Sequence, residues 1–181
     1  MSGHNKWSKI KRKKEASDGA KSRIFSKHAS VIAMEARKAK GDVNSPGLAS
    51  AIERAKKDSM PKENIDRAVQ KGKAAEGAEL LEVIYEAFGP GGTAIIVTAV
   101  TDNGNRTTPE MRHVFKEAGF ALGATGSASW AFTKTADGYI PQNRIDLSDE
   151  DGEKLASLIE KLEEHEDVQD VFTTADSPDG E

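Results

Sequence analysis

The sequence predicts an α+β protein: an N-terminal three-helix domain followed by a small β-β-α-β-α-β sheet domain with its helices on one face. Apolar residues recur at helical spacing as far as Gly72, whereas Thr93–Val100 is a nearly unbroken apolar run rich in β-branched side chains. The net charge also changes sign, because residues 1–73 hold 19 Lys or Arg against 8 Asp or Glu (+11) and residues 74–181 hold 7 against 22 (−15). We therefore expect a basic domain at 1–73, an acidic domain at 80–174 and a polar tail at 175–181.

The composition of the 181 residues limits the possible functions. Charged residues make up 31% and aromatic residues 6%, so the cores should be lean. There is no cysteine, which excludes disulfides, thiol nucleophiles and thiolate metal sites. No apolar run approaches the ~20 residues of a membrane span, and the basic N-terminus lacks the apolar core of a signal peptide. We expect a cytoplasmic protein that is monomeric, binds no cofactor or metal and does not contact a membrane.

The first fourteen residues form a basic arm. The segment GHNKWSKIKRKK at Gly3–Lys14 is mostly cationic and is interrupted by one aromatic residue. Cations of this density suit phosphates, and an indole can stack on a base. The alternative is a solvated tail whose Trp7 and Ile10 dock on the first domain. The arm residues predicted to contact nucleic acid are Lys6, Trp7, Lys9, Lys11, Arg12, Lys13 and Lys14.

Three helices are expected in the rest of the basic half. They span about 17–40, 46–59 and 61–72, with Gly41 ending the first and Gly72 ending the third. Their basic side chains spread over several faces instead of gathering on one recognition helix, which favours backbone contacts over reading of base sequence. The helix residues predicted to contact nucleic acid are Lys21, Arg23, Arg37, Lys38, Lys56 and Lys57.

The acidic half is organised around a glycine turn between two strands. Leu80–Phe88 and Thr93–Thr101 should form a hairpin around Gly89–Gly92, with the second strand in the centre of the sheet. A strand at Trp130–Thr133 should carry Trp130 and Phe132 on one face. A helix capped by Thr107 or Thr108 should have Pro109 at its first position and end at Ala118. An extended segment is expected at 139–140, a helix should begin at 148–150, and the last strand should span 168–174.

The polar turn after the central strand is a second candidate site. Asp102, Asn103, Asn105 and Arg106 could hold a phosphate or a metal, although a satisfied turn is the simpler interpretation. A metal site would need more ligands at fixed spacing, and two of these four side chains are amides. No carboxylate pair, Ser/His/Asp set or phosphate-loop signature accompanies them, so we do not expect an enzyme. Asn103, Asn105 and Arg106 remain candidates for contact with an anion or with ribosomal RNA.

Four ordered motifs carry a resemblance to a known family. They are GHNKWSKIK at Gly3–Lys11, IYEAFGPGGTAIIV at Ile84–Val97, TDNGNRT at Thr101–Thr107 and EHEDVQDVFTT at Glu164–Thr174. With these motifs the chain resembles the YebC family, also described as YebC/PmpR-like regulators and related to the mitochondrial translational activator of cytochrome oxidase.

The resemblance has one departure. Family members usually carry an additional α/β domain between the segments that match Trp130–Thr133 and Tyr139–Pro141. Only Lys134–Gly138 stands there in this chain. The resemblance therefore implies a compact member in which a hairpin turn replaces the inserted domain.

The resemblance also implies a function in gene expression. Members are described as DNA-binding transcriptional regulators, and some as ribosome-associated translation factors that relieve stalling at sequences such as proline runs. The family labels favour DNA, whereas the spread basic faces of this chain favour RNA or recognition of shape. A protein-interaction module that works through the acidic domain is a third possibility.

Overall fold

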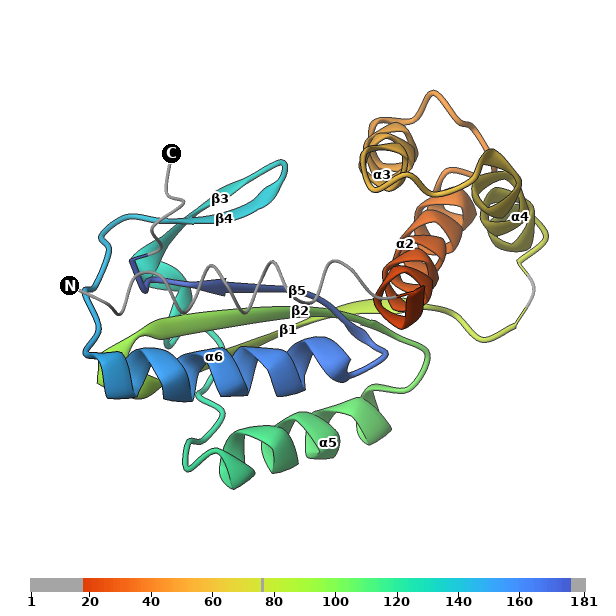
Figure 1. The fold of residues 1–181 in the computed structure, drawn as a ribbon. Helices are drawn as coiled ribbons and strands as arrows, with labels where there is room; N and C mark the ends of the chain where they lie inside the picture. Colours follow the sequence, from red (N-terminus) through yellow and green to blue (C-terminus); the bar gives the residue numbers. More distant parts are fainter. Residues whose placement is uncertain (1–17, 76, 177–181) are drawn as a thin grey trace. The chain divides into compact units, whose positions relative to one another are not determined.

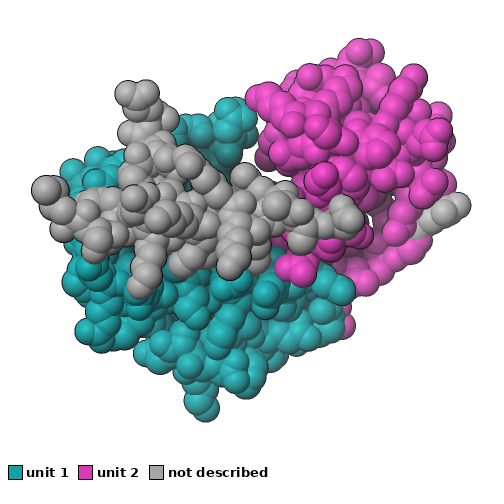
Figure 2. Space-filling view, viewed as in Figure 1, with its two compact units in different colours: residues 1–16, 82–99, 104–181 teal, residues 17–81, 100–103 magenta. Residues whose placement is uncertain are grey.

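The computed structural model describes residues 18–75 and 77–176 (Figure 1). These residues divide into two compact units, which are described separately (Figure 2). The first unit runs from the start of α2 to Leu81 and includes residues 100–103, and the second takes residues 82–99 and those from Gly104 onward. None of the described helices is both long and apolar enough to cross a membrane. The elements are α2 (Asp18–Lys38), α3 (Pro46–Lys57), α4 (Lys62–Lys73), β1 (Leu81–Phe88), η1 (Pro90–Gly92), β2 (Ala94–Thr101), α5 (Gly104–Glu117), η2 (Ser129–Ala131), β3 (Phe132–Thr135), β4 (Gly138–Pro141), α6 (Asp149–Glu164) and β5 (Val168–Thr173).

The three predicted helices of the first unit are present, and α3 and α4 both pack on α2. Ile32, Leu48 and Ile65 contribute one buried side chain each to their common core. α2 ends at Lys38, two residues before the expected end, and the chain then turns through Lys40 and Gly41, whose φ values are 51° and 82°. The N–H of Gly41 donates to the carbonyl of Ala36 at 2.8 Å.

The prediction that Gly72 ends α4 is wrong. The helix continues through Gly72 to Lys73. A Cβ at position 72 would lie 2.2 Å from the backbone oxygen of Ala33 on α2. Gly72 is therefore required by the close approach of two helices and not by a helix terminus.

The second unit contains a three-stranded sheet with the order β1-β2-β5, and β5 runs antiparallel to β2. The prediction that β2 is the central strand is confirmed, and all of its residues are buried except Thr98, which is half-buried. The glycine turn between β1 and β2 depends on Gly91 and Gly92, whose φ values are 63° and 76°.

Different elements pack against the two faces of this sheet. Ile95 and Val97 of β2 pack in one core with Phe115 of α5 and Leu158 of α6, so both helices cover the same face. The opposite face carries Ile96, which packs with residues of the β3–β4 hairpin. The predicted α+β fold class, with helices on one face, is confirmed (Figure 1).

The β3–β4 hairpin is a separate two-stranded sheet. Its register pairs Phe132 with Pro141 and Lys134 with Tyr139, so the two segments on either side of the short turn are neighbours, as predicted for a compact chain. The prediction that Trp130 and Phe132 share a face is wrong, because residues 129–131 form a turn of 3-10 helix and strand alternation begins only at Phe132. Trp130 is 68% exposed, whereas Phe132 is 5% exposed.

The start of α5 also differs from the prediction. The helix begins at Gly104, three to four residues before the expected Thr caps, and Pro109 lies inside it. Pro109 lacks the N–H that would bond to the carbonyl of Asn105, so its cost is one hydrogen bond near the helix start. Thr107 does not cap the helix, because its buried hydroxyl donates to Asp167 at 2.7 Å.

A buried carboxylate on β1 organises the glycine-rich loop before β3. Glu86 is 6% exposed and accepts hydrogen bonds from the backbone N–H groups of Gly126 at 2.7 Å, Ala128 at 2.8 Å and Ser129 at 2.7 Å. Burial raises the pKa of Glu86, but the hydrogen bonds from the three backbone N–H groups, together with one from the Ser129 side chain, outweigh it and hold the pKa below its ordinary value. Glu86 therefore fixes the loop as an ionised group.

Candidate nucleic-acid interface

The predicted nucleic-acid contacts fall into two groups. Lys6, Trp7, Lys9, Lys11, Arg12, Lys13 and Lys14 lie outside the described residues. The other six predicted residues lie on α2 and α3 of the first unit.

The α2 residues predicted to contact nucleic acid lie toward its two ends, and a further lysine, Lys27, lies in the middle of the helix. Lys21 and Arg23 are exposed near the start, and Arg37 and Lys38 are in the last turn. Fourteen residues separate Arg23 from Arg37, which is about 21 Å along a helix. One guanidinium nitrogen of Arg37 donates to the carbonyl of Ala78 at 3.4 Å, and the Lys38 ammonium lies 2.8 Å from a Glu35 carboxylate oxygen. The cations of α2 therefore do not form one compact patch.

Lys56 and Lys57 lie in the last turn of α3 and are both exposed. The Lys56 ammonium donates to Glu53 at 2.7 Å, and this hydrogen bond and its charge hold the pKa of Glu53 below the ordinary value. Lys57 forms no ion pair with any residue that the structure describes. Basic side chains in a last turn also stabilise the helix itself, so each of these lysines has a structural role besides any contact with phosphate.

The polar turn at the start of α5 presents Asn103, Asn105 and Arg106 as exposed residues. The Arg106 guanidinium lies 2.8 Å from Asp167 and 3.2 Å from Glu110. An anion at this turn would therefore meet a cation whose charge two carboxylates already compensate.

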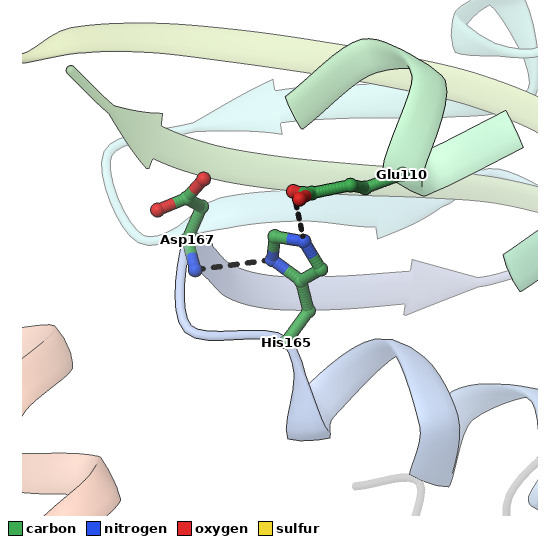
Figure 3. A group of neighbouring side chains, drawn as sticks. All are labelled: Glu110, His165 and Asp167. Atoms are coloured by element: carbon green, nitrogen blue, oxygen red, sulfur yellow. Dashed lines mark hydrogen bonds and ion pairs between the residues drawn. The ribbon is translucent and has the colours of Figure 1, made fainter. Parts of the chain in front are cut away.

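The same turn belongs to a cluster that sequence reasoning missed. Glu110 on α5 meets His165 and Asp167, which follow α6, and ligand-type atoms of the three residues all lie within 4.8 Å of one another (Figure 3). His165 Nε2 is 2.9 Å from a Glu110 oxygen, and the backbone N–H of Asp167 donates to His165 Nδ1 at 3.2 Å. Glu110 is more than fifty positions away from His165 and Asp167 in the sequence, so no local spacing identifies the cluster.

The hydrogen bonds of His165 assign its tautomer. Nδ1 accepts a backbone N–H, so the proton of the neutral ring lies on Nε2 and is donated to Glu110. A metal ion would need a ring nitrogen with a free lone pair, and one nitrogen is used as an acceptor while the other carries the proton. Together with Arg106 in the cluster, this favours a structural network that ties the start of α5 to the α6–β5 connection.

Comparison with known proteins identifies the family. The family model described as the TACO1/YebC protein N-terminal domain matches residues 5–75, and the one described as the TACO1/YebC second and third domain matches residues 80–137 and 134–175. The chain therefore belongs to the TACO1/YebC family. The second model is interrupted within the β3–β4 turn, which confirms the expectation of a compact member.

Individual relatives agree with this assignment. "Probable transcriptional regulatory protein Teth39_1009" of Thermoanaerobacter pseudethanolicus is 39% identical over 242 aligned positions, which cover 99% of this chain and 98% of the relative. Since this chain has 181 residues, about sixty residues of that relative have no counterpart here. A "Probable transcriptional regulatory protein" of Thermotoga petrophila is 41% identical over 98% of this chain and 71% of its own length. The crystal structure of the conserved hypothetical protein Aq1575 from Aquifex aeolicus matches with a TM-score of 0.78 and 30% identity, over 90% of this chain and 93% of that one.

Proposed function

We propose that this protein is a non-enzymatic regulator of gene expression that binds nucleic acid in the cytoplasm through its basic N-terminal half. The charge asymmetry carries the proposal, because residues 1–73 hold a net charge of +11 and the rest of the chain −15. A polyanion would be attracted by the first part and repelled by the second. The names of the relatives support a role in gene expression.

Duplex DNA is the first candidate partner, since the relatives are named as probable transcriptional regulatory proteins. Ribosomal RNA is the second, and one observation favours it. If α3 and α4 acted as a helix-turn-helix, the start of α4 would enter the major groove, yet Glu63 and Asp66 are exposed in its first two turns. Carboxylates there would repel the phosphates that flank the major groove of a duplex, so α4 is not suited to be a recognition helix for duplex DNA.

Binding to both partners at one salt concentration tests the proposal. The full chain would be titrated against a fluorescent duplex DNA, and its co-sedimentation with ribosomes would be measured in the same buffer. The double variant Arg23→Glu and Lys57→Glu should weaken binding to the true partner. Lys154→Glu with Lys161→Glu is the matched control, because both lysines are exposed on α6 of the acidic unit.

Two results would reject the proposal. One is the absence of binding to DNA, RNA and ribosomes at low salt, and the other is equal weakening by the two double variants. The non-enzymatic part has its own test, since turnover of phosphoester substrates that survives repurification would contradict it.

A further inference from the structure

The first unit contains a groove between α3 and α4 that sequence reasoning did not single out. Its floor is formed by Met60, Ile65 and Val69, and Val43 at its edge is 50% exposed although it is apolar. The groove has a volume of about 620 Å³, within the roughly 300–1,000 Å³ of ligand pockets. It is therefore large enough for a small planar ligand.

Polar groups line both walls above this floor. Lys62, Asp66 and Gln70 follow one another at four-residue spacing along α4, so they form one row on the same side of the helix. Lys56 stands on the α3 wall. Within the described chain, neither the Asp66 carboxylate nor the Gln70 amide has a protein hydrogen-bond partner, so both are available to a ligand.

We propose that this groove binds one unpaired nucleotide of a single-stranded nucleic acid and prefers guanine; the proposal rests on the proposed nucleic-acid binding. The flat faces of a base can cover the apolar floor, and the ammonium group of Lys62 suits an adjoining phosphate. Lys56 adds a second cation at the rim, although its ammonium already lies 2.7 Å from Glu53. Such a nucleotide must be unpaired, because a paired base cannot leave its stack to enter the groove.

The preference for guanine follows from Asp66. An ionised carboxylate only accepts hydrogen bonds, so it selects a base edge that offers donors. The Watson–Crick edge of guanine presents its ring N–H and its amino group side by side and can bond both carboxylate oxygens. Uracil presents one N–H between two carbonyls, which the carboxylate would repel.

The alternative occupant is an apolar helix of a partner protein. Such a helix would cover the floor, but it would also take Asp66 out of water without supplying a donor. The charge of the unit favours a polyanion as well, since residues 18–81 hold 13 Lys or Arg against 9 Asp or Glu. A nucleotide is the occupant that satisfies the floor, the lysines and the carboxylate together.

Two labelled RNA decamers test the proposal with the full chain. One is a run of ten uridines, and the other has a single guanosine at its centre. The guanosine decamer should bind about five- to tenfold more tightly, as expected for one bidentate contact. Asp66→Asn should bring the two affinities to within about twofold, and because Asp66 is exposed this variant does not threaten folding.

A second pair of variants tests the floor. Val43→Asp should weaken binding of the guanosine decamer about fivefold or more. Ile140→Asp is the control, because Ile140 is a 55% exposed apolar residue on β4 of the acidic unit, and its variant should bind like the parent chain.

The outcomes separate this inference from the proposed function. Equal binding of the two decamers, or discrimination that survives Asp66→Asn, overturns the nucleotide site while leaving nucleic-acid binding intact. Equal binding would also make a partner helix the better occupant of the groove. Binding of neither decamer, together with no binding to duplex DNA or ribosomes, overturns both proposals.

Discussion

Replacing Glu86 by Gln should destabilise the protein by about 2–4 kcal/mol. The carboxylate accepts three backbone hydrogen bonds of 2.7 to 2.8 Å while it is only 6% exposed. Hydrogen bonds to charged groups contribute about 1.5–3 kcal/mol each, and a buried donor left without a partner costs about 1–3 kcal/mol. Gln retains one carbonyl oxygen but turns an NH₂ group toward backbone N–H donors, so part of this stabilisation is lost.

Urea unfolding followed by circular dichroism at neutral pH measures this change in the free energy of unfolding. Glu82→Gln is the matched control, since Glu82 lies on the same strand but is exposed, and its change should stay within about 0.5 kcal/mol. Hydrogen exchange should show that the loss of stability in Glu86→Gln is local, with faster exchange at the amides of Gly126, Ala128 and Ser129 than in the parent chain. Equal stability of the two variants would refute the role assigned to Glu86.

The pH dependence provides a second check on Glu86. Its pKa is lower in the folded protein than in the unfolded chain, so the unfolded state binds the proton more tightly. The stabilisation is therefore fully present above the unfolded pKa of about 4.3 and is lost as pH falls through the lower folded value. The stability difference between the parent chain and Glu86→Gln should be constant above about pH 6 and shrink in acid. A difference that grows on acidification would contradict this sign.

Three further predictions follow from the packing. Gly72→Ala should destabilise the helical unit by about 1–3 kcal/mol in thermal unfolding, because the new methyl group would collide with the backbone of α2. Gly19→Ala is the control: it has open space around it, so it should leave the stability unchanged or raise it. Thr107→Val should cost about 1–2 kcal/mol in urea unfolding, since Asp167 loses a buried donor; an unchanged midpoint would show that Arg106 alone satisfies that carboxylate. Limited proteolysis should cut first within residues 73–79 and leave two folded pieces, and a first cut elsewhere would count against that domain boundary.

The sequence pattern predicted those elements whose formation depends on their own residues and their immediate neighbours in the chain. The apolar run of β2 predicted a central strand, and Gly41 marked the turn that follows α2, although the helix itself ends at Lys38. Gly72 shows the limit of such reasoning: a glycine that ends a helix and one that admits a neighbouring helix look alike in sequence. Trp130 and Phe132 show another, because alternation predicts a common face only where the strand has already begun.

The Glu86 loop, the Arg106 cluster and the groove depend on contacts between residues far apart in the sequence, so the sequence revealed less of them. The loop that Glu86 holds begins forty residues later, and no spacing rule connects a strand carboxylate with a distant glycine-rich loop. Arg106 was predicted to be available to an anion, yet its partner Asp167 lies sixty-one positions away. The groove likewise exists only because α3 and α4 pack on a third helix. The basic arm is a prediction from composition alone, and it lies outside the described residues.

The most direct test of the central claim is the salt dependence of single-strand binding with and without residues 1–14. The arm carries six Lys or Arg between Lys6 and Lys14, and each phosphate contact contributes about −0.7 to the slope of log affinity against log salt. If all six bind phosphates, the deletion should weaken binding and flatten that slope by about 4, while circular dichroism shows the helices intact. Trp7→Ala should cost affinity without changing the slope. Unchanged affinity and slope after the deletion would contradict the claim that this arm binds nucleic acid.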